Sequence, residues 1–372
     1  MSFAQRILCH AWLVKMSLLE QRRWHKRGSK SSSIKVYYGQ DRIPRPDEPA
    51  SGGVIKCQDL DAVFPNDPVN PNLLYLVSSN LPAHLSVLIP AVKRAGAPIV
   101  LNQNGVAYPA WHGAGWEKTN QRLSLAHSAA DYIFYQSKFC RESALRFLGK
   151  ATDQFEVLAN PVDTTFFTPG LSKKSIFSPI LLTAGSHNSF YRVQLAVDIM
   201  KRLMNDYPSI RLIVAGRFRW GKSEAGANSE IRQYVQDSHV ADRVEWLGAY
   251  NQMEAPDLFR RADILLHATY NDACPRLVVE AMACGLPIVY SASGGVPELV
   301  GDKAGIGVPA PLDWNKIHPP SLANLLEATK KICTRYVEYS GEARKRAVEM
   351  FDVKTWIQRH REIFTRLLNS GL

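Results

Sequence analysis

The sequence has few of the features that mark several classes of protein. Its six cysteines are scattered over 372 residues without a CxxC pair or a nearby histidine, so neither a disulfide framework nor a zinc site is indicated. The apolar stretch from Ile7 to Leu19 has only 13 residues and includes His10 and Lys15, so it cannot span a bilayer. No small-residue cleavage site follows it, which argues against a signal peptide. These absences indicate a cytoplasmic protein with reduced thiols.

Acidic residues are almost absent from the N-terminus. Positions 1–35 hold eight Lys or Arg and one acid, Glu20, in a chain of net charge +11. Residues 1–33 therefore form a basic leader that would attract an anionic membrane surface. No nucleic-acid motif accompanies this charge, so a nucleic acid is not expected as a partner. The leader is either a frayed terminus or an interfacial helix in peripheral contact with a membrane, whose lipid-facing residues would be Phe3, Ile7, Trp12, Leu18 and Leu19.

Beyond the leader, short apolar runs alternate with segments of helical spacing. This α/β alternation predicts parallel sheets covered by helices, and the length suits two domains. The alternation starts anew after a polar stretch near residues 170–178. We therefore expect a first Rossmann-like domain at 34–172 and a second at 173–345, followed by a C-terminal helix within 346–372 that crosses back to the first domain.

The stretch from His267 to Val300 carries the most chemical information. Asp272 precedes Glu280 by eight positions, and between them the chain passes from a strand end into a helix. Nucleotides bind at the carboxyl ends of strands in such sheets, where helix N-termini offer free N–H groups to phosphate. The sequence thus predicts a nucleotide site at this turn.

This stretch resembles the signature of the retaining glycosyltransferases of family 4, which reads E-x7-E, A-M-A-C-G-x-P-V and G-G-x-x-E. Residues 272–298 match all of it except the first Glu. The resemblance implies a GT-B fold, with two Rossmann-like doubly wound domains facing across a cleft. It assigns the sugar hydroxyls of the donor to Asp272 and the ribose to Glu280. Pro275 stands where the family usually has Gly, which removes one backbone N–H. The further donor-binding residues that it implies are Arg276, Leu277, Gly294 and Gly295.

A second match follows the strand expected at 180–185. The family has G-R, a short loop and K-G here, and the two cations bracket the donor diphosphate. This chain has Gly185, Ser186 and Arg192 at those places. The resemblance makes Arg192 a catalytic cation, and its guanidinium fork suits phosphate oxygens. Because Ser186 is uncharged, we expect Arg217, after the next strand, to supply the missing charge.

The first half resembles the family more loosely. The glycines Gly52 and Gly53 stand at a strand-to-helix junction where the family lets the backbone approach the donor. Asn104 stands at the His of the family's T-x-H-G, and a neutral amide cannot act as a general base. In the retaining reaction proposed for the family, the leaving phosphate oxygen can take the acceptor proton instead. We expect Asn102, Asn104 and Tyr108 to orient acceptor hydroxyls. A strand pair usual after the first helix is missing, so this domain is abbreviated.

Taken together, the resemblance predicts an enzyme of glycan or polysaccharide biosynthesis. It would move a sugar from a nucleoside-diphosphate sugar to a saccharide or lipid-linked acceptor, with no metal and no further cofactor. The departures at Ser186, Asn104 and Asp272 favour one alternative, a non-catalytic sugar-nucleotide or glycan-binding protein on the same fold. A sugar-nucleotide epimerase is a third hypothesis.

Overall fold

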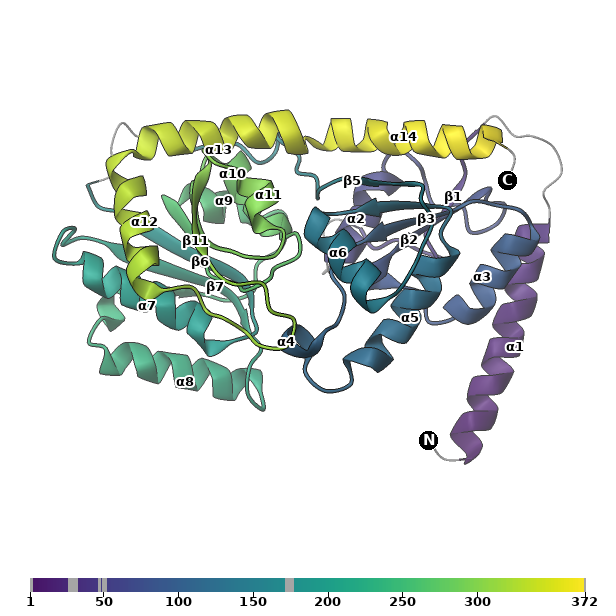
Figure 1. The fold of residues 1–372 in the computed structure, drawn as a ribbon, viewed down its shortest axis with the longest axis horizontal. Coiled ribbons are helices and arrows are strands. Elements are labelled where there is room, and N and C mark those ends of the chain that lie inside the picture. The colour runs from purple at the N-terminus through teal and green to yellow at the C-terminus, as the bar shows by residue number, and fades with distance from the viewer. Residues whose placement is uncertain (1–2, 26–32, 46–47, 49–51, 171–176, 371–372) are drawn as a thin grey trace. The chain divides into compact units, whose positions relative to one another are not determined.

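Two α/β units make up the chain in this computed structural model, which describes residues 3–25, 33–45, 48, 52–170 and 177–370 (Figure 1). Unit 1 comprises residues 1–158 and 354–372, and unit 2 comprises 159–353. This division differs from the expected boundaries at 172 and 346. Residues 159–170 pack within unit 2, where Nδ2 of Asn160 donates to the carbonyl of Cys274 at 2.6 Å and Arg344 donates to the carbonyl of Phe167 at 2.7 Å.

Unit 1 holds a five-stranded parallel sheet in the order β1-β2-β3-β4-β5. The strands follow one another across the sheet in chain order. Apolar and aromatic residues form each central strand, and both faces of the sheet are buried, as parallel sheets require. The strands are β1 (Val36–Tyr37), β2 (Leu73–Val77), β3 (Ile99–Gln103), β4 (Tyr132–Tyr135) and β5 (Phe155–Val157).

Helices cover both faces of this sheet. One core joins the strands to α2 and to α14, and it includes Cys57, Leu60, Trp356 and Phe364. The C-terminal helix α14 is thus part of unit 1. The helices of this unit are α1 (Phe3–His25), α2 (Gly52–Asp61), η1 (Ser78–Asn80), α3 (Leu85–Arg94), α4 (Pro109–His112), α5 (Trp116–Ala129), α6 (Lys138–Phe147) and α14 (Val353–Ser370).

Unit 2 holds a six-stranded parallel sheet in the order β11-β10-β9-β6-β7-β8. Strand order reverses between β6 and β9, which are neighbours in the sheet, so this sheet is doubly wound. The strands are β6 (Ile180–His187), β7 (Arg211–Phe218), β8 (Val244–Leu247), β9 (Ile264–His267), β10 (Ile288–Ala292) and β11 (Gly305–Pro309).

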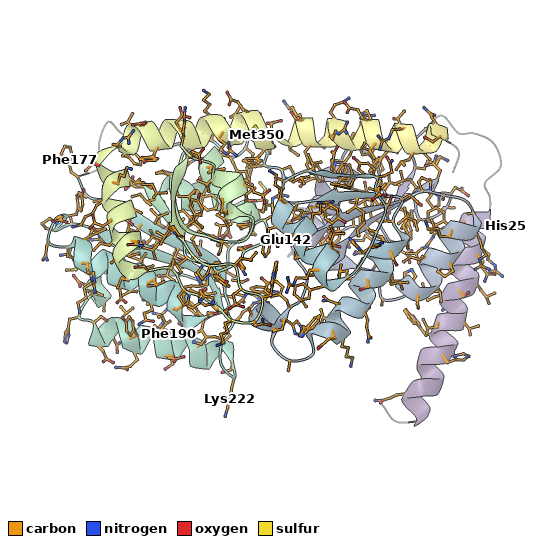
Figure 2. All side chains as sticks on the ribbon, viewed as in Figure 1. His25, Glu142, Phe177, Phe190, Lys222 and Met350 are labelled. Carbon is orange, nitrogen blue, oxygen red and sulfur yellow. The ribbon has the colours of Figure 1, made fainter. Side chains whose placement is uncertain are left out.

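A large apolar core lies between the unit 2 sheet and helices α7, α8 and α12, and side chains fill the interior of each unit (Figure 2). The helices of this unit are α7 (Phe190–Leu203), α8 (Glu224–Asp237), η2 (Ala241–Arg243), α9 (Ala255–Arg260), α10 (Arg276–Ala283), α11 (Val296–Val300), α12 (Leu322–Thr334) and α13 (Tyr336–Phe351). None of the helices in the described ranges combines the length and the apolar character that crossing a membrane requires.

The N-terminal leader forms a helix over most of its length. Helix α1 ends in a buried turn, where Glu20 is fully buried and Trp24 is 4% exposed. A frayed terminus is therefore wrong for the second half of α1. The side chains of Phe3 and Ile7, and the linker at 26–32, lie outside the described residues.

Candidate active site

The point where strand order reverses in unit 2 gathers polar side chains. Strands β6 and β9 are neighbours there, with Leu181 opposite Ile264 and Leu182 opposite Leu265, so their carboxyl ends lie side by side. In doubly wound sheets this reversal opens a crevice outside the strand ends, and ligands bind in it. Both stretches that the sequence analysis singled out, 185–192 and 267–280, begin at these two strand ends.

Arg192 is buried in the first turn of α7, with 7% of its surface exposed. Its Nη1 donates to the carbonyl of Ser186, while its Nε has no hydrogen-bond partner among the described residues. Burial lowers the pKa of Arg192, and the Asp272 carboxylate acts in the opposite direction. Arginine stays charged under such shifts, so a buried cation follows β6 at the switch point.

His187, the last residue of β6, adds a second unsatisfied group. Its Nε2 donates to the carbonyl of Ala215 at 3.1 Å, and its ring stacks on Phe218. Burial lowers the pKa of His187 to about 3, and the charge of Arg192 adds to this effect. The ring is therefore neutral at physiological pH, and its buried Nδ1 is an acceptor without a described partner.

The loop after β9 presents the predicted acid. Asp272 accepts a hydrogen bond from Nε2 of His267 at 3.1 Å, with the Asp272 side chain 28% exposed and the His267 side chain 2% exposed. The hydroxyl of Tyr191 accepts from the backbone N–H of Tyr270 at 3.1 Å, which ties this loop to the start of α7. The hydroxyl of Thr269 is buried and has no described partner. Buried groups without a described partner thus follow both of the neighbouring strands β6 and β9.

Close backbone contacts shape this loop and require glycine. Gly294 has φ of +67°, and a Cβ there would lie 2.4 Å from the carbonyl oxygen of Asp272. The N–H of Gly295 donates to the same carbonyl at 2.8 Å. The predicted pair Gly294 and Gly295 therefore holds the backbone of Asp272 in place. At the neighbouring strand end, Gly185 has φ of +98°, and its missing side chain would meet Leu277 at 3.4 Å.

Glu280 lies on α10, the helix that Pro275 precedes. It is 6% exposed, and its Oε1 accepts from Nε of Arg276 at 2.9 Å and from Nε2 of Gln252 at 3.0 Å. A carboxylate has about four acceptor positions, so these two bonds leave capacity for ligand hydroxyls. Burial raises the pKa of Tyr250 above its usual range, and the charge of Glu280 adds to this effect.

Arg217 stands one strand away from the crevice. It pairs in register with Ser186 across β6 and β7, and both residues are exposed. Arg217 lines a small hollow of about 150 Å³ at the ends of β7 and β8, together with Trp246, Gly248 and Ala249. The structure thus places Arg217 beside Ser186, the position where the resembling family has a cation.

Of the predicted acceptor-side residues, Asn102 lies in β3 of unit 1, and Asn104 and Tyr108 follow that strand. Oδ1 of Asn102 accepts from Nε2 of Gln136 at 2.7 Å, and Asn102 is buried. Asn104 is half-buried, and its Oδ1 accepts from the hydroxyl of Ser78 at 2.5 Å. Tyr108 is 3% exposed and stacks on Phe147 at 5.8 Å, so packing accounts for its ring. Of the three, Asn104 is the most accessible.

The glycine pair opens α2 as expected. A Cβ on Gly53 would lie 2.6 Å from the hydroxyl oxygen of Ser79, so this glycine lets η1 approach the helix. Gly52 has open space around its Cα. Among the residues that the structure describes, no three His, Cys, Asp or Glu side chains gather as a metal site.

No family motif assigns a role to His187, His267, Thr269 or Gln252, so the sequence alone did not predict them as site residues. The two histidines each end a strand at the switch point, and this position at a strand end is the sequence feature that could have indicated them. Gln252 lies 28 residues before Glu280, and only the fold brings them together.

Comparisons with known proteins agree with the resemblance that the motifs of the second half indicate. Residues 172–340 match the sequence model of the family described as glycosyl transferases group 1. The gpi3 subunit of phosphatidylinositol N-acetylglucosaminyltransferase from Schizosaccharomyces pombe is 23% identical over 246 residues, which cover 66% of this chain and 50% of that protein. D-inositol 3-phosphate glycosyltransferase of Mycolicibacterium smegmatis is 30% identical over 156 residues, 40% of this chain and 35% of that protein. The chain thus spans half or less of these two relatives.

Solved structures share the fold over most of their length. HepE of Anabaena, crystallised with UDP, superposes with a TM-score of 0.62 at 21% identity and covers 80% of this chain and 79% of its own. Sucrose-phosphate synthase of Thermosynechococcus elongatus gives 0.63 at 15% identity, covering 85% and 77%. The chain thus has two parallel α/β units of the GT-B type, and residues 172–340, which make up most of unit 2, are similar to the glycosyl transferases group 1 family.

Proposed function

We propose that this chain is a retaining glycosyltransferase of family 4 that uses a nucleoside-diphosphate sugar. The observation that carries the proposal is the switch point of unit 2, where the buried cation Arg192 and the accessible carboxylate of Asp272 follow the neighbouring strands β6 and β9. A buried cation with an unpaired Nε suits a diphosphate, whose charge grows as the glycosidic bond breaks. The half-exposed carboxylate suits sugar hydroxyls, which donate hydrogen bonds.

Each remaining group has a role in this scheme. Glu280 accepts hydrogen bonds from the ribose hydroxyls, while Gln252 and Arg276 fix its orientation. Arg217 supplies the charge that Ser186 lacks, reaching the diphosphate from the next strand. His187 stays neutral and offers Nδ1 as an acceptor beside Arg192.

The reaction balances without a protein base. The bond between the anomeric carbon and the phosphate oxygen breaks, and the acceptor oxygen bonds to the same face of that carbon. The acceptor proton passes to the leaving phosphate oxygen. This route fits Asn104 on the acceptor side, because its amide can orient a hydroxyl but cannot take its proton.

For the substrates, we propose a uridine-diphosphate sugar and an acceptor that contains inositol phosphate. HepE was crystallised with UDP and with UDP-glucose, which supports the uridine donor. The two curated relatives named above carry phosphatidylinositol and inositol 3-phosphate in their names. A lipid-linked acceptor such as phosphatidylinositol agrees with this chemistry.

A second candidate function is a binding protein without turnover. The absence of a cation at Ser186 and the shorter acid at Asp272 favour it, because both remove interactions that would stabilise the transition state of transfer. Such a protein would keep its affinity for the sugar nucleotide and transfer nothing.

The test is a turnover assay with UDP-N-acetylglucosamine and UDP-glucose, each with phosphatidylinositol or inositol 3-phosphate. We expect UDP release that depends on the acceptor, and proton NMR should show the anomeric configuration of the donor in the product. Donor binding without release would favour the binding protein. An inverted product would overturn the retaining assignment, and release of free UDP with an epimerised sugar would favour the epimerase.

A further inference from the structure

Helix α1 is fixed to unit 1 by its last two turns. The buried Glu20 accepts hydrogen bonds from Arg23 and from Nε1 of Trp24, and it lies 3.3 Å from Nε2 of His84. Arg23 also donates to the carbonyl of Pro68 at 2.5 Å. The helix is therefore held by its last two turns, and it also packs along α3, where the ring of Trp12 meets His84 edge-on.

The exposed surface of α1 combines apolar and cationic side chains. Leu8 is 69% exposed, Leu18 is 53% exposed, and Trp12 and Leu19 are also exposed. Lys15 and Arg22 are exposed as well, and positions 8, 12, 15, 19 and 22 share one helical stripe. Within α1 the only acid is Glu20, which is buried on the other side. This stripe is therefore apolar and positively charged.

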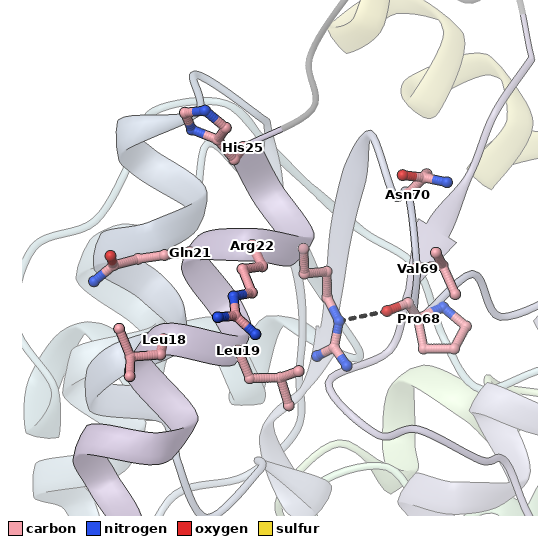
Figure 3. Close-up of a pocket in the computed structure, with 9 residues that line it drawn as sticks. Leu18, Leu19, Gln21, Arg22, His25, Pro68, Val69 and Asn70 are labelled. Atoms are coloured by element: carbon pink, nitrogen blue, oxygen red, sulfur yellow. Dashed lines mark hydrogen bonds between the residues drawn. The ribbon is translucent and has the colours of Figure 1, made fainter.

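A groove continues the stripe toward the body of unit 1. It has a volume of about 710 Å³ and lies between α1 and residues 68–70 (Figure 3). Figure 3 shows Leu19 and Arg22 on the α1 side, with Pro68 and Val69 across from them. Val69 is 67% exposed, so apolar surface lies on both sides of the groove.

Acidic groups beside the groove are already engaged. Asp41 accepts from Nη2 of Arg23 at 2.7 Å. Asp67 accepts from the backbone N–H groups of Val69 and Asn70 at 3.0 and 2.8 Å. Among the described residues, neither acid forms an ion pair with Lys15 or Arg22.

We propose that this stripe of α1 and the groove beside Val69 form a docking surface for an anionic phospholipid bilayer. Leu and Trp side chains enter the boundary between head groups and acyl chains, and Lys15 and Arg22 contact the lipid phosphates. Charge complementarity selects this occupant, because a partner that buried the stripe through apolar contacts alone would leave two cations without counter-charges. The proposal does not depend on glycosyl transfer.

The experiment is vesicle co-sedimentation of the full chain, which keeps the buried anchor intact. Phosphatidylcholine vesicles with and without phosphatidylserine are compared at low and high salt. One variant carries Lys15→Gln with Arg22→Gln, and its charge-matched control carries Lys201→Gln with Arg202→Gln on the exposed side of α7 in unit 2. A second variant carries Leu18→Gln with Leu19→Gln, and its control carries Val337→Gln with Met350→Gln on α13.

We expect the chain to bind anionic vesicles, to release them at high salt, and to bind neutral vesicles weakly. Removal of the two α1 cations should weaken binding about 30-fold, since each contributes a factor of about 5 near an anionic surface. Removal of the two leucines should also weaken it, and both controls should bind as the parent does. The absence of vesicle binding by the parent, or equal binding by the α1 variants and their controls, would overturn the proposal. Self-association that the leucine variant abolishes, without vesicle binding, would assign the surface to a second copy instead.

Discussion

Nε2 of His267 lies 3.1 Å from Oδ2 of Asp272, which joins the last residue of β9 to the acid expected to hold the donor sugar. His267 is buried behind the carboxylate, whereas Asp272 remains accessible. The histidine therefore orients the acid from the protein side. Since Asp is one methylene shorter than the family's Glu, this fixed orientation determines how far the carboxylate reaches.

Replacing Asp272 with Asn should lower kcat/KM for the sugar donor about 100-fold or more. The amide keeps the shape but loses the charge, and one such contact in a transition state contributes about 3 kcal/mol. His267→Gln should cost less, because an amide N–H can still donate to the acid. Steady-state kinetics with matched melting curves would check this, and full activity of the Asn variant would remove Asp272 from the site.

Replacing Arg192 with Met should lower kcat by about 100-fold or more, since no other buried cation is described at the switch point. Arg217→Met is the matched comparison, because this cation is exposed and one strand away. We expect a smaller loss there, about 10-fold, as for a partly solvated phosphate contact. A larger effect at Arg217 than at Arg192 would reverse the roles that we assign to them.

Replacing Glu280 with Gln should weaken UDP binding by about 2 kcal/mol, the scale of a hydrogen bond to a charged group. The change also leaves Arg276 without its carboxylate partner, so a loss of stability must be separated from a loss of affinity. Calorimetric titration with UDP measures the affinity, and Gln252→Ala serves as the control that disturbs Glu280 without removing its charge. Equal affinity of the parent and the Gln variant would exclude the ribose contact.

Sequence patterns predicted the central strands well, because buried parallel strands are continuous apolar runs. The apolar run LLYLV at 73–77, for example, is β2 residue for residue. Strand β11 escaped prediction, since GIGVP at 305–309 holds two glycines and a proline, which weaken a strand signal. Gly305 is required there, because a Cβ would lie 2.1 Å from the carbonyl oxygen of Ile288.

Only those residues of the candidate site that belong to a family motif could be predicted from the sequence. Asp272, Glu280 and Arg192 were found through the resemblance, and the fold places Asp272 and Arg192 at one switch point. Gln252 and His187 carry no motif, and their contacts arise from strand order and burial. For the leader, the sequence could not decide between a frayed terminus and an interfacial helix. The 3.6-residue periodicity does not show that Glu20, Arg23 and Trp24 are buried against unit 1.

Replacing Gly294 with Ala should impair the site through a clash with the backbone. Its Cβ would lie 2.4 Å from the carbonyl oxygen of Asp272, which cannot move without displacing the acid. Gly221 is a matched control, since it has the same φ of +67° and open space around its Cα. Both alanines pay about 1 kcal/mol for the left-handed backbone, and only Gly294→Ala should also lower kcat/KM. Equal activity of the two variants would show that the loop absorbs the methyl group.

The last prediction concerns acid stability and rests on His360 in the core of unit 1. This side chain is fully buried, its Nδ1 donates to the carbonyl of Trp356 at 2.8 Å, and its Nε2 accepts from the hydroxyl of Tyr75 at 3.0 Å. The bond from Tyr75 requires the neutral ring, because a protonated Nε2 cannot accept, and burial lowers the pKa of His360 to about 3 from 6.5. The unfolded chain therefore takes up the proton first as the pH falls. The contribution of the neutral His360 ring to the free energy of unfolding is fully present above pH 6.5. It decreases as the pH falls, until at about pH 3 the folded form is protonated as well.

Between neutral pH and about pH 5, this group should reduce the free energy of unfolding by about 2 kcal/mol. His360→Gln removes the titrating ring and keeps an amide that can donate and accept, so the variant should be less stable at neutral pH but lose less stability on acidification. Denaturant unfolding at the two pH values, followed for the parent and the variant, measures the difference. His127, whose pKa burial lowers to about 4, continues to titrate in both proteins and cancels in the comparison. If the stability of the two proteins depends on pH in the same way, the pKa of His360 is the same in the folded and the unfolded chain, and the prediction is wrong.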